Sequence, residues 1–201
     1  MSHYLFWDER YSEPGSAYGD EPNVWVKEQL SVLSPGKVLI PACGQGRDAI
    51  YAAQLGWKVL AFDQSEIGIS QLELFAKQEQ LSIIAKVENA LQFKPAPEFD
   101  ALLLIYFHLP PEQRPAMHHL MAGGLKPGGW LILEAFSPAQ INYQSGGPQK
   151  PDWLFKLEDL KQDFPEFYFH FAEEQVVQLN EGKYHQGDAS IVRILAQKKG
   201  F

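Results

Sequence analysis

The stretch from residue 38 to residue 63 constrains the fold more than any other part of the chain. It reads Val-Leu-Ile-Pro-Ala-Cys-Gly-Gln-Gly-Arg-Asp, then a helical run, then Val-Leu-Ala-Phe-Asp, which predicts strand, glycine turn, helix and strand. Gly44 and Gly46 carry no Cβ, so a ligand can approach their backbone closely. Asp63 ends the second strand about 20 residues later, where nucleotide-binding sheets place a carboxylate against ribose hydroxyls. The segment therefore predicts a site for a nucleoside-containing cofactor.

Strands and helices continue to alternate after this segment. We expect strands at 38–41, 58–62, 83–87, 101–106 and 130–134, and helices at 23–33, 47–55, 66–80, 111–123 and 157–164. Strands separated by helices predict an α/β fold with a parallel sheet and right-handed crossovers. Residues 173–179 and 190–197 alternate apolar and polar side chains, which predicts a closing antiparallel hairpin.

The segments between these elements carry turn and loop signals. Asn23 is a plausible N-cap for the helix that follows it. Residues 1–23 indicate a helical turn and a loop, and Leu125-Lys-Pro-Gly-Gly129 indicates a sharp turn. Residues 137–150 are rich in Gly, Pro, Ser, Gln and Asn and too long for a simple connector, so we expect a functional loop there.

Composition narrows the class of protein. A chain of 201 residues predicts one domain, and its net charge of −8 argues against nucleic-acid binding, which needs a concentrated basic surface. The single cysteine fits a reducing compartment, and no apolar run reaches the length of a membrane span. The N-terminus lacks the pattern of a signal peptide, so we expect a cytoplasmic protein. No spacing of His, Cys and Asp indicates a metal site.

Two kinds of cofactor fit the glycine turn. Gly44-x-Gly46-x-x-Ala49 matches the dinucleotide fingerprint, which leaves a nicotinamide-dependent oxidoreductase open. Such an enzyme usually needs a second mononucleotide-binding half or a substrate domain. After the fifth strand this chain has only a loop, a helix and a hairpin, which favours a different cofactor.

An ordered set of motifs resembles the class I S-adenosylmethionine-dependent methyltransferases. The set comprises the glycine turn, Asp63, Asn89-Ala90, Asp100, Leu125-Lys-Pro-Gly-Gly129 and the terminal hairpin. The resemblance implies a single-domain Rossmann-like methyltransferase fold, with a mostly parallel seven-stranded sheet and a C-terminal antiparallel hairpin. Within residues 1–201 it implies an N-terminal lid and helix at 1–33, a cofactor-binding core at 34–136, and a substrate-side loop, helix and closing hairpin at 137–201.

A narrower resemblance points to small bacterial methyltransferases of the tellurite-resistance type, which are relatives of the thiopurine S-methyltransferases. It rests on Phe6-Trp-Asp-Glu-Arg-Tyr11, Cys43-Gly-Gln-Gly-Arg-Asp48, His108-Leu-Pro-Pro, Gly146-Gly-Pro and Tyr184-His-Gln-Gly187. One position departs from the wider class, because Ile40 stands where many class I enzymes have Asp or Glu. The form Pro-x-Cys-Gly is instead similar to the thiopurine and halide/thiol methyltransferases.

The resemblance implies which residues hold S-adenosylmethionine. Asp63 would bind the ribose, and capping of the next helix is the alternative. Asn89 would pair with adenine, and an Asx turn is the alternative. Trp7 and Tyr11 would cover the cofactor as a lid or pack as core staples, and Cys43 would be a packed small residue instead of a nucleophile. The implied set is Trp7, Tyr11, Cys43, Gly44, Gly46, Arg47, Asp63, Gln64, Asn89, Ala90, Ile105 and Tyr106.

Four residues are candidates for the chemistry. Tyr106 would end the fourth strand near the sulfonium, at the sheet edge where ligands sit. His108 follows that strand, and the resemblance implies that His185 and Arg193 face the acceptor; an ordinary polar hairpin is the alternative. A histidine can accept a proton and an arginine can hold an oxyanion.

The resemblance implies in-line transfer of a methyl group to a small molecule, with S-adenosylhomocysteine as the product. It also implies that the acceptor is a thiol or a chalcogen compound of the tellurite or selenite type. A non-catalytic S-adenosylmethionine-binding protein is the alternative from another class. We expect a monomer or homodimer with no nucleic-acid or membrane partner.

Overall fold

The computed structural model describes residues 3–200, and its seven strands form one sheet. In chain order the elements are α1 (His3–Ser12), α2 (Val24–Leu30), β1 (Lys37–Pro41), α3 (Arg47–Gln54), β2 (Lys58–Asp63), α4 (Glu66–Gln78), β3 (Ile83–Val87), β4 (Phe99–Ile105), α5 (Arg114–Gly123), β5 (Leu125–Phe136), the 3₁₀ helices η1 (Pro138–Asn142) and η2 (Pro151–Trp153), α6 (Leu157–Asp163), β6 (Phe167–Glu181) and β7 (His185–Lys198).

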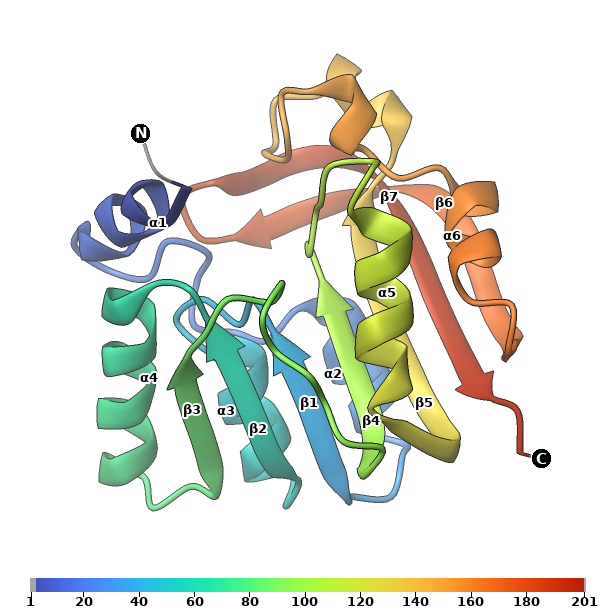
Figure 1. Cartoon of the computed structure of the whole chain (residues 1–201). Helices are drawn as coiled ribbons and strands as arrows, with labels where there is room; N and C mark the ends of the chain where they lie inside the picture. The colour runs from blue at the N-terminus through green and yellow to red at the C-terminus, as the bar shows by residue number, and fades with distance from the viewer. Residues whose placement is uncertain (1–2, 201) are drawn as a thin grey trace.

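The strand order is β3-β2-β1-β4-β5-β7-β6 (Figure 1). The strands from β3 to β5 pair in parallel, whereas β7 is antiparallel to both β5 and β6. The predicted α/β fold, with a mostly parallel seven-stranded sheet and an antiparallel C-terminal hairpin, is confirmed. Because β7 lies between β5 and β6, the second strand of the hairpin joins it to the parallel part of the sheet.

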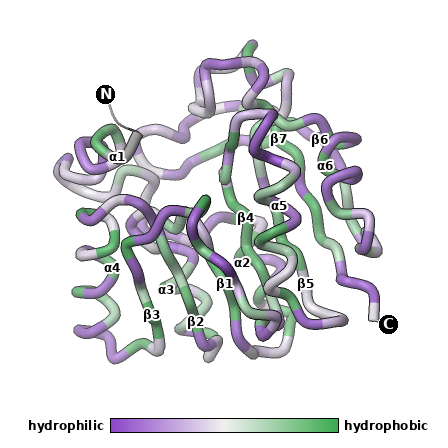
Figure 2. The backbone as a smooth tube through the Cα atoms, in the orientation of Figure 1, coloured by the Kyte–Doolittle hydropathy of each residue, from purple (hydrophilic) through white to green (hydrophobic). Residues whose placement is uncertain are grey.

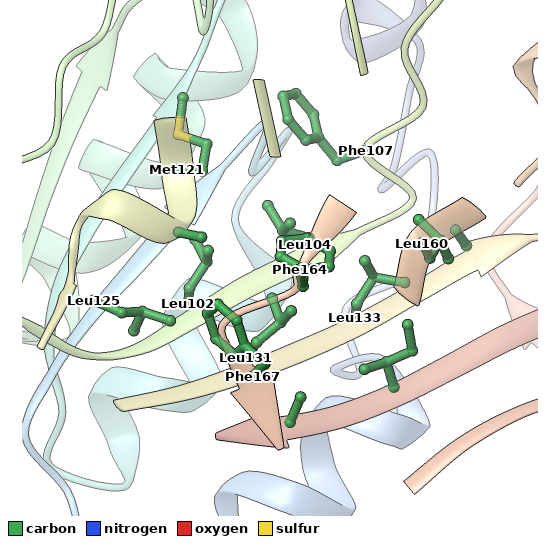
Figure 3. Packing of buried hydrophobic residues seen from close by; sticks show 14 of the residues in the cluster. Leu102, Leu104, Phe107, Met121, Leu125, Leu131, Leu133, Leu160, Phe164 and Phe167 are labelled. Atoms are coloured by element: carbon green, nitrogen blue, oxygen red, sulfur yellow. The ribbon is translucent and has the colours of Figure 1, made fainter. Parts of the chain in front are cut away.

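Helices cover both faces of the sheet. This explains why the sequence of β4 is continuously apolar. Leu102 and Leu104 pack in a cluster with residues of α5 and α6, while Leu103 packs in the cluster that contains residues of α2 and α3. Figure 3 shows Leu102 and Leu104 beside Met121 and Leu131, and the hydrophobic colour in Figure 2 runs along β4. A strand buried on both faces cannot alternate apolar and polar side chains. Each buried leucine stabilises the fold by about 1.5–3 kcal/mol.

Four predictions about local structure were incomplete or wrong. Residues 125–129 form no separate turn but lie within β5, where the pairing with β4 is irregular and Gly128 has φ +77°. The hairpin strands extend beyond both predicted ranges, and the N-terminus forms a ten-residue helix instead of a single turn. The predicted loop at 137–150 contains η1, and η2 follows directly after it. The hairpin strands are longer than predicted because β6 and β7 pair with each other from Phe167 to Glu181.

Within residues 3–200, no helix is long and apolar enough to span a membrane.

The glycine turn gives a prediction about stability. Gly46 has φ +86°, and a Cβ there would overlap the side chain of Leu72, which is fully buried. Gly56 has φ +90°, but nothing lies within 4 Å of a Cβ built there. Gly56→Ala should therefore lower the free energy of unfolding by about 1–2 kcal/mol from backbone strain alone. Gly46→Ala should cost about 1–3 kcal/mol more because of the overlap. Urea denaturation measures both, and equal losses would contradict the packing at Gly46.

Candidate active site

The turn after β1 brings several backbone amides to the carboxyl edge of the sheet. Ala42, Gly44 and Gly46 all have positive φ, at 51°, 55° and 86°. The chain is held there by the Cys43 N–H, which donates to the Phe62 carbonyl at 3.1 Å. α3 begins directly after the turn, so its unpaired N–H groups face the same side. This arrangement suits a ligand that approaches main-chain atoms closely.

Asp63 lies next to this turn at the end of β2. One carboxylate oxygen accepts the Gly44 N–H and the other accepts the Ser65 N–H, both at 2.9 Å. Burial raises the pKa of Asp63, and these backbone hydrogen bonds oppose that rise. Ser65 caps α4, because its side chain accepts the Gly68 N–H. Asp63 is therefore not the N-cap of this helix, which was the alternative to a role in ribose binding.

α1 packs over the turn. Tyr11 is buried, and a Cβ built on Gly44 would lie 2.6 Å from its hydroxyl oxygen. Trp7 stacks on Tyr11 with ring centroids 5.7 Å apart. Asp8 accepts a hydrogen bond from the Ser65 hydroxyl at 2.5 Å, which fixes α1 to the start of α4. The structure thus places the predicted lid residues above the glycine turn.

The segment after α1 connects the turn to the tip of the β6–β7 hairpin. The Ala17 N–H donates to the side chain of Gln45 at 2.8 Å, and the Ala17 carbonyl accepts from the Lys183 N–H at 3.1 Å. Gly19 packs so closely that a Cβ there would lie 3.0 Å from the Gly182 nitrogen. Figure 1 shows the hairpin tip beside α1.

Asn23 bridges two buried glutamates at the centre of the site. Its amide nitrogen donates to Glu134 at 2.6 Å and to Glu181 at 3.0 Å. Its side-chain oxygen accepts the Val26 N–H at 3.1 Å, which confirms the predicted N-cap. All three polar side chains are less than 8% exposed. The bridge therefore joins three segments that are far apart in the sequence.

Glu134, at the end of β5, holds two of the predicted catalytic residues. Its Oε1 accepts the Tyr106 hydroxyl at 2.7 Å and its Oε2 accepts Nε–H of Arg193 at 2.6 Å. Burial and the neighbouring carboxylate raise the pKa of Tyr106 well above its usual range, so the phenol stays protonated and donates. Tyr106 also has φ +51°, an uncommon conformation for a non-glycine residue that concentrates at functional sites.

Glu181, at the hairpin tip, holds two further candidates. It accepts from Arg47 at 3.0 Å and lies 3.2 Å from Nδ1 of His185. Burial alone would raise the pKa of Glu181, but His185 and Arg47 outweigh it and lower the pKa to about 2. The side chains of Glu181, His185 and Arg47 are 7%, 7% and 12% exposed.

Aromatic rings surround His185. The rings of Tyr18 and Tyr106 each lie 4.6 Å from the imidazole centroid, and that of Phe136 lies at 5.2 Å. Burial lowers the pKa of His185 against the opposing effect of Glu181, so the ring is neutral near pH 7. Glu181 then selects the tautomer with the proton on Nδ1. Nε2 has no hydrogen-bond partner within the described part of the chain and is an acceptor.

The structure does not support the catalytic role predicted for His108. Nδ1 of His108 lies 2.7 Å from the Trp153 carbonyl, and Nε2 accepts the Phe136 N–H at 3.1 Å. Burial lowers its pKa to about 4, so the ring is neutral. Both nitrogens are engaged with backbone groups, and His108 therefore anchors the loop between β5 and α6.

The remaining predicted cofactor residues lie along the same edge of the sheet. Asn89 forms the Asx turn that was its alternative, because its side-chain oxygen accepts the Leu91 N–H at 2.9 Å. Ala90 packs against the core, and Gln64 and Ile105 are half-buried at the ends of β2 and β4. Burial raises the pKa of the Cys43 thiol well above its usual range, as expected for a packed residue.

Sequence reasoning missed the two glutamates and the second role of Asn23. One signal was available, because Glu134 is a lone charge in the otherwise apolar run from Trp130 to Phe136. A buried charge needs a partner, so a charged residue in the middle of an apolar strand predicts an ion pair or a hydrogen bond in the core. Glu181 gave no comparable signal, since a polar residue before Gly182 is ordinary in a turn.

The low pKa of Glu181 gives a prediction with a defined sign. Its pKa is about 2 in the folded protein against an ordinary value of 4.5, so the carboxylate stabilises the fold above pH 4.5. That contribution is lost as the pH falls from 4.5 toward 2. Glu181→Gln should lower the free energy of unfolding by about 3 kcal/mol at pH 7.

Urea denaturation at several pH values tests this effect. The difference between the variant and the wild type should shrink as the pH approaches 2. Glu112→Gln, at an exposed position, is the control and should change stability by less than about 0.5 kcal/mol. A deficit of the Glu181 variant that stays constant with pH would contradict the assignment.

Comparisons with known proteins match most of the length of this chain. A family model described as "Tellurite resistance protein TehB" matches residues 19–197. The "Probable S-adenosyl-L-methionine-dependent methyltransferase TehB" of Haemophilus influenzae (strain 10810) is 28% identical over 184 residues, which cover 87% of this chain and 61% of that protein. The "Probable thiol methyltransferase 2" of Arabidopsis thaliana is 30% identical over 122 residues, which cover 58% of this chain and 52% of that protein.

A solved structure agrees at the level of the fold. The crystal structure of TehB from Haemophilus influenzae matches with a TM-score of 0.73 at 21% identity, over 98% of this chain and 67% of that one. This chain spans only 61% of the length of the curated Haemophilus protein. The range matched by the family model contains the glycine turn, Asp63, β6 and all but the last residue of β7, while α1 lies outside it. The resemblance predicted from the sequence is confirmed, and the chain belongs to the TehB family.

Proposed function

We propose that this protein is an S-adenosylmethionine-dependent methyltransferase that acts on a small molecule, either a thiol or another chalcogen compound. The observation that carries the proposal is the glycine turn with the Asp63 carboxylate beside it, at the sheet edge that also holds Tyr106 and His185. The names of the Haemophilus and Arabidopsis relatives support methyl transfer, and the second supports a thiol.

The residues present fit this cofactor. The two Asp63 oxygens offer about four lone pairs. They accept backbone N–H groups of Gly44, Ser65 and Gln64, which leaves a lone pair for a ribose hydroxyl. The unpaired N–H groups at the start of α3 face the same edge of the sheet, and the faces of Trp7 and Tyr11 suit a positively charged sulfur. Gln64, Ala90 and the rest of the predicted set would line the same edge. We assign the cofactor to the core at 34–136 and the acceptor side to 137–201.

For this reaction the protein needs only to position the donor and the acceptor and to provide one proton acceptor. S-adenosylmethionine supplies a methyl group on a sulfonium sulfur: the acceptor's electron pair forms a bond to that carbon while the carbon–sulfur bond breaks and its electrons stay on the donor. His185 is neutral and presents Nε2, which takes the thiol proton. Glu181 stabilises the resulting imidazolium, and the rings of Tyr18 and Tyr106 exclude water.

α1 takes part as a lid in this proposal. Trp7 and Tyr11 cover the glycine turn, so α1 opens when a cofactor binds or leaves, while Asn23 and α2 stay fixed to the sheet. We further propose a cytoplasmic monomer or homodimer that binds neither nucleic acid nor membranes; the net charge of −8 supports the first of these two exclusions.

Calorimetric titration tests the cofactor. The wild type should bind S-adenosylmethionine and S-adenosylhomocysteine and not NADH. Asp63→Asn should weaken both adenosyl ligands at least 10-fold, because a charged acceptor is worth about 1.5–3 kcal/mol. Asp152→Asn, at an exposed position, is the matched control and should bind as the wild type does. Binding of NADH alone would favour the oxidoreductase, and adenosyl binding without methyl transfer would favour a non-catalytic binding protein.

A pH profile tests His185. With a thiol acceptor, His185→Ala should lower kcat about 100-fold below the pKa of the thiol, where a proton must be removed. The deficit should shrink above that pKa, because the thiolate then forms in water. Mass spectrometry of the methyl thioether measures the rate. A deficit that does not change with pH would leave His185 without a role in proton transfer.

A further inference from the structure

Arg10 belongs to the motif Phe6-Trp-Asp-Glu-Arg-Tyr11, and the proposed function assigns no task to its side chain. It lies on α1, one turn after Phe6, whose ring centroid is 5.0 Å from the guanidinium carbon. α1 is outside the residues that the family model matches, so the family match says nothing about Arg10. Figure 1 shows α1 beside the tip of the β6–β7 hairpin, and the guanidinium lies at this junction.

The guanidinium of Arg10 is held in place but keeps most of its hydrogen-bond donors. Its carbon lies 3.5 Å from the ring centroid of Tyr184, and one N–H donates to the Tyr18 hydroxyl at 3.2 Å. A guanidinium presents several N–H donors in one fixed plane. Among the residues that the structure describes, the Arg10 side chain makes this one hydrogen bond and no ion pair. Its other N–H donors are therefore available to a ligand.

Two other arginines near the site are already paired. Arg47 is ion-paired with Glu181 at 3.0 Å, and Arg193 with Glu134 at 2.6 Å. Their side chains are 12% and 11% exposed, so both pairs are largely shielded from water and salt. Arg10 differs from them, because an anion that binds its guanidinium has no internal ion pair to displace.

Glu13 is a carboxylate near Arg10, but it has partners of its own. Lys183 donates to one of its oxygens, and the Tyr184 hydroxyl donates to the other. These hydrogen bonds lower the pKa of Glu13, and Arg10 adds a weaker electrostatic effect. Glu13 therefore fixes the ring of Tyr184 against the guanidinium without forming an ion pair with Arg10.

The Tyr18 hydroxyl supplies a second donor at the same place. Burial raises the pKa of Tyr18 although Arg10 opposes that rise, so the phenol stays protonated. Its oxygen accepts from Arg10, and its proton has no acceptor among the residues that the structure describes. The ring of Tyr18 lies 4.6 Å from the imidazole centroid of His185. A guanidinium and a hydroxyl that converge in this way are the donors that bind oxyanions.

From these contacts we infer that Arg10 and the Tyr18 hydroxyl form an oxyanion subsite between α1 and the hairpin tip. This inference rests on the proposed methyl transfer and deepens it. Two ligands of that reaction can carry the group: a chalcogen oxyanion as the acceptor, and the donor through the carboxylate of its amino-acid end. Both present oxygen atoms that share a negative charge, and the planar guanidinium can donate to two such oxygens at once.

Calorimetry on Arg10→Gln tests the subsite with two pairs of ligands. S-adenosylhomocysteine is compared with its decarboxylated form, and sodium selenite is compared with phenylmethanethiol on protein saturated with S-adenosylhomocysteine. The substitution should weaken the oxyanion-bearing member of one pair at least 10-fold and its partner by less than about 3-fold. A loss in the first pair assigns the subsite to the donor, and a loss in the second assigns it to the acceptor. Equal effects on both members of each pair, or none, would overturn the subsite.

Two further variants separate the subsite from the folding of α1. Tyr18→Phe removes the hydroxyl and keeps the ring, so it should weaken the same ligand as Arg10→Gln does. Glu9→Gln, at an exposed neighbouring position of α1, is the matched control and should bind all four ligands as the wild type does. A loosened α1 would weaken ligands with and without an oxyanion alike. Absence of S-adenosylhomocysteine binding to the wild type would instead overturn the proposed function, and selenite added to the protein alone then tests the subsite.

Discussion

The amide of Asn23 is the interaction on which the rest of the site depends. It satisfies Glu134 from the parallel sheet and Glu181 from the hairpin, and its own oxygen starts α2. Two buried carboxylates so close together would repel each other without a shared donor and their two arginines. Through this bridge the N-terminal segment, the sheet and the hairpin become one rigid frame, and Tyr106 and His185 take fixed positions within it.

The local pattern of apolar and turn residues was sufficient to predict the parallel half of the sheet. The bounds of β1, β2 and β3 follow from short apolar runs that are closed by turn residues, and Asn23 was identified as a cap from its type and place. Asp63 and the glycine turn followed from spacing. These features depend on contacts between segments that are near in the chain, which is why one sequence suffices to predict them.

The acceptor side depends on pairings that local sequence does not encode. Arg193 contacts Glu134 only because β7 lies between β5 and β6 in the sheet. The alternating apolar and polar residues of the hairpin do not indicate which of its two strands pairs with β5. The same limit explains His108, whose backbone partners come from β5 and from the loop that follows it. The sequence shows that a histidine or an arginine is able to take part in catalysis. Only the fold shows whether its side chain is already bound to another group of the protein.

The stretch around Ala17 ties two parts of the site together. It holds the glycine turn through Gln45 and the hairpin tip through Lys183 at once. In the function that we propose, a nucleoside lies beneath α1, and this stretch links its side of the site to the strand end that carries His185. Exchange of the nucleoside is therefore mechanically coupled to the acceptor side through a few residues of backbone.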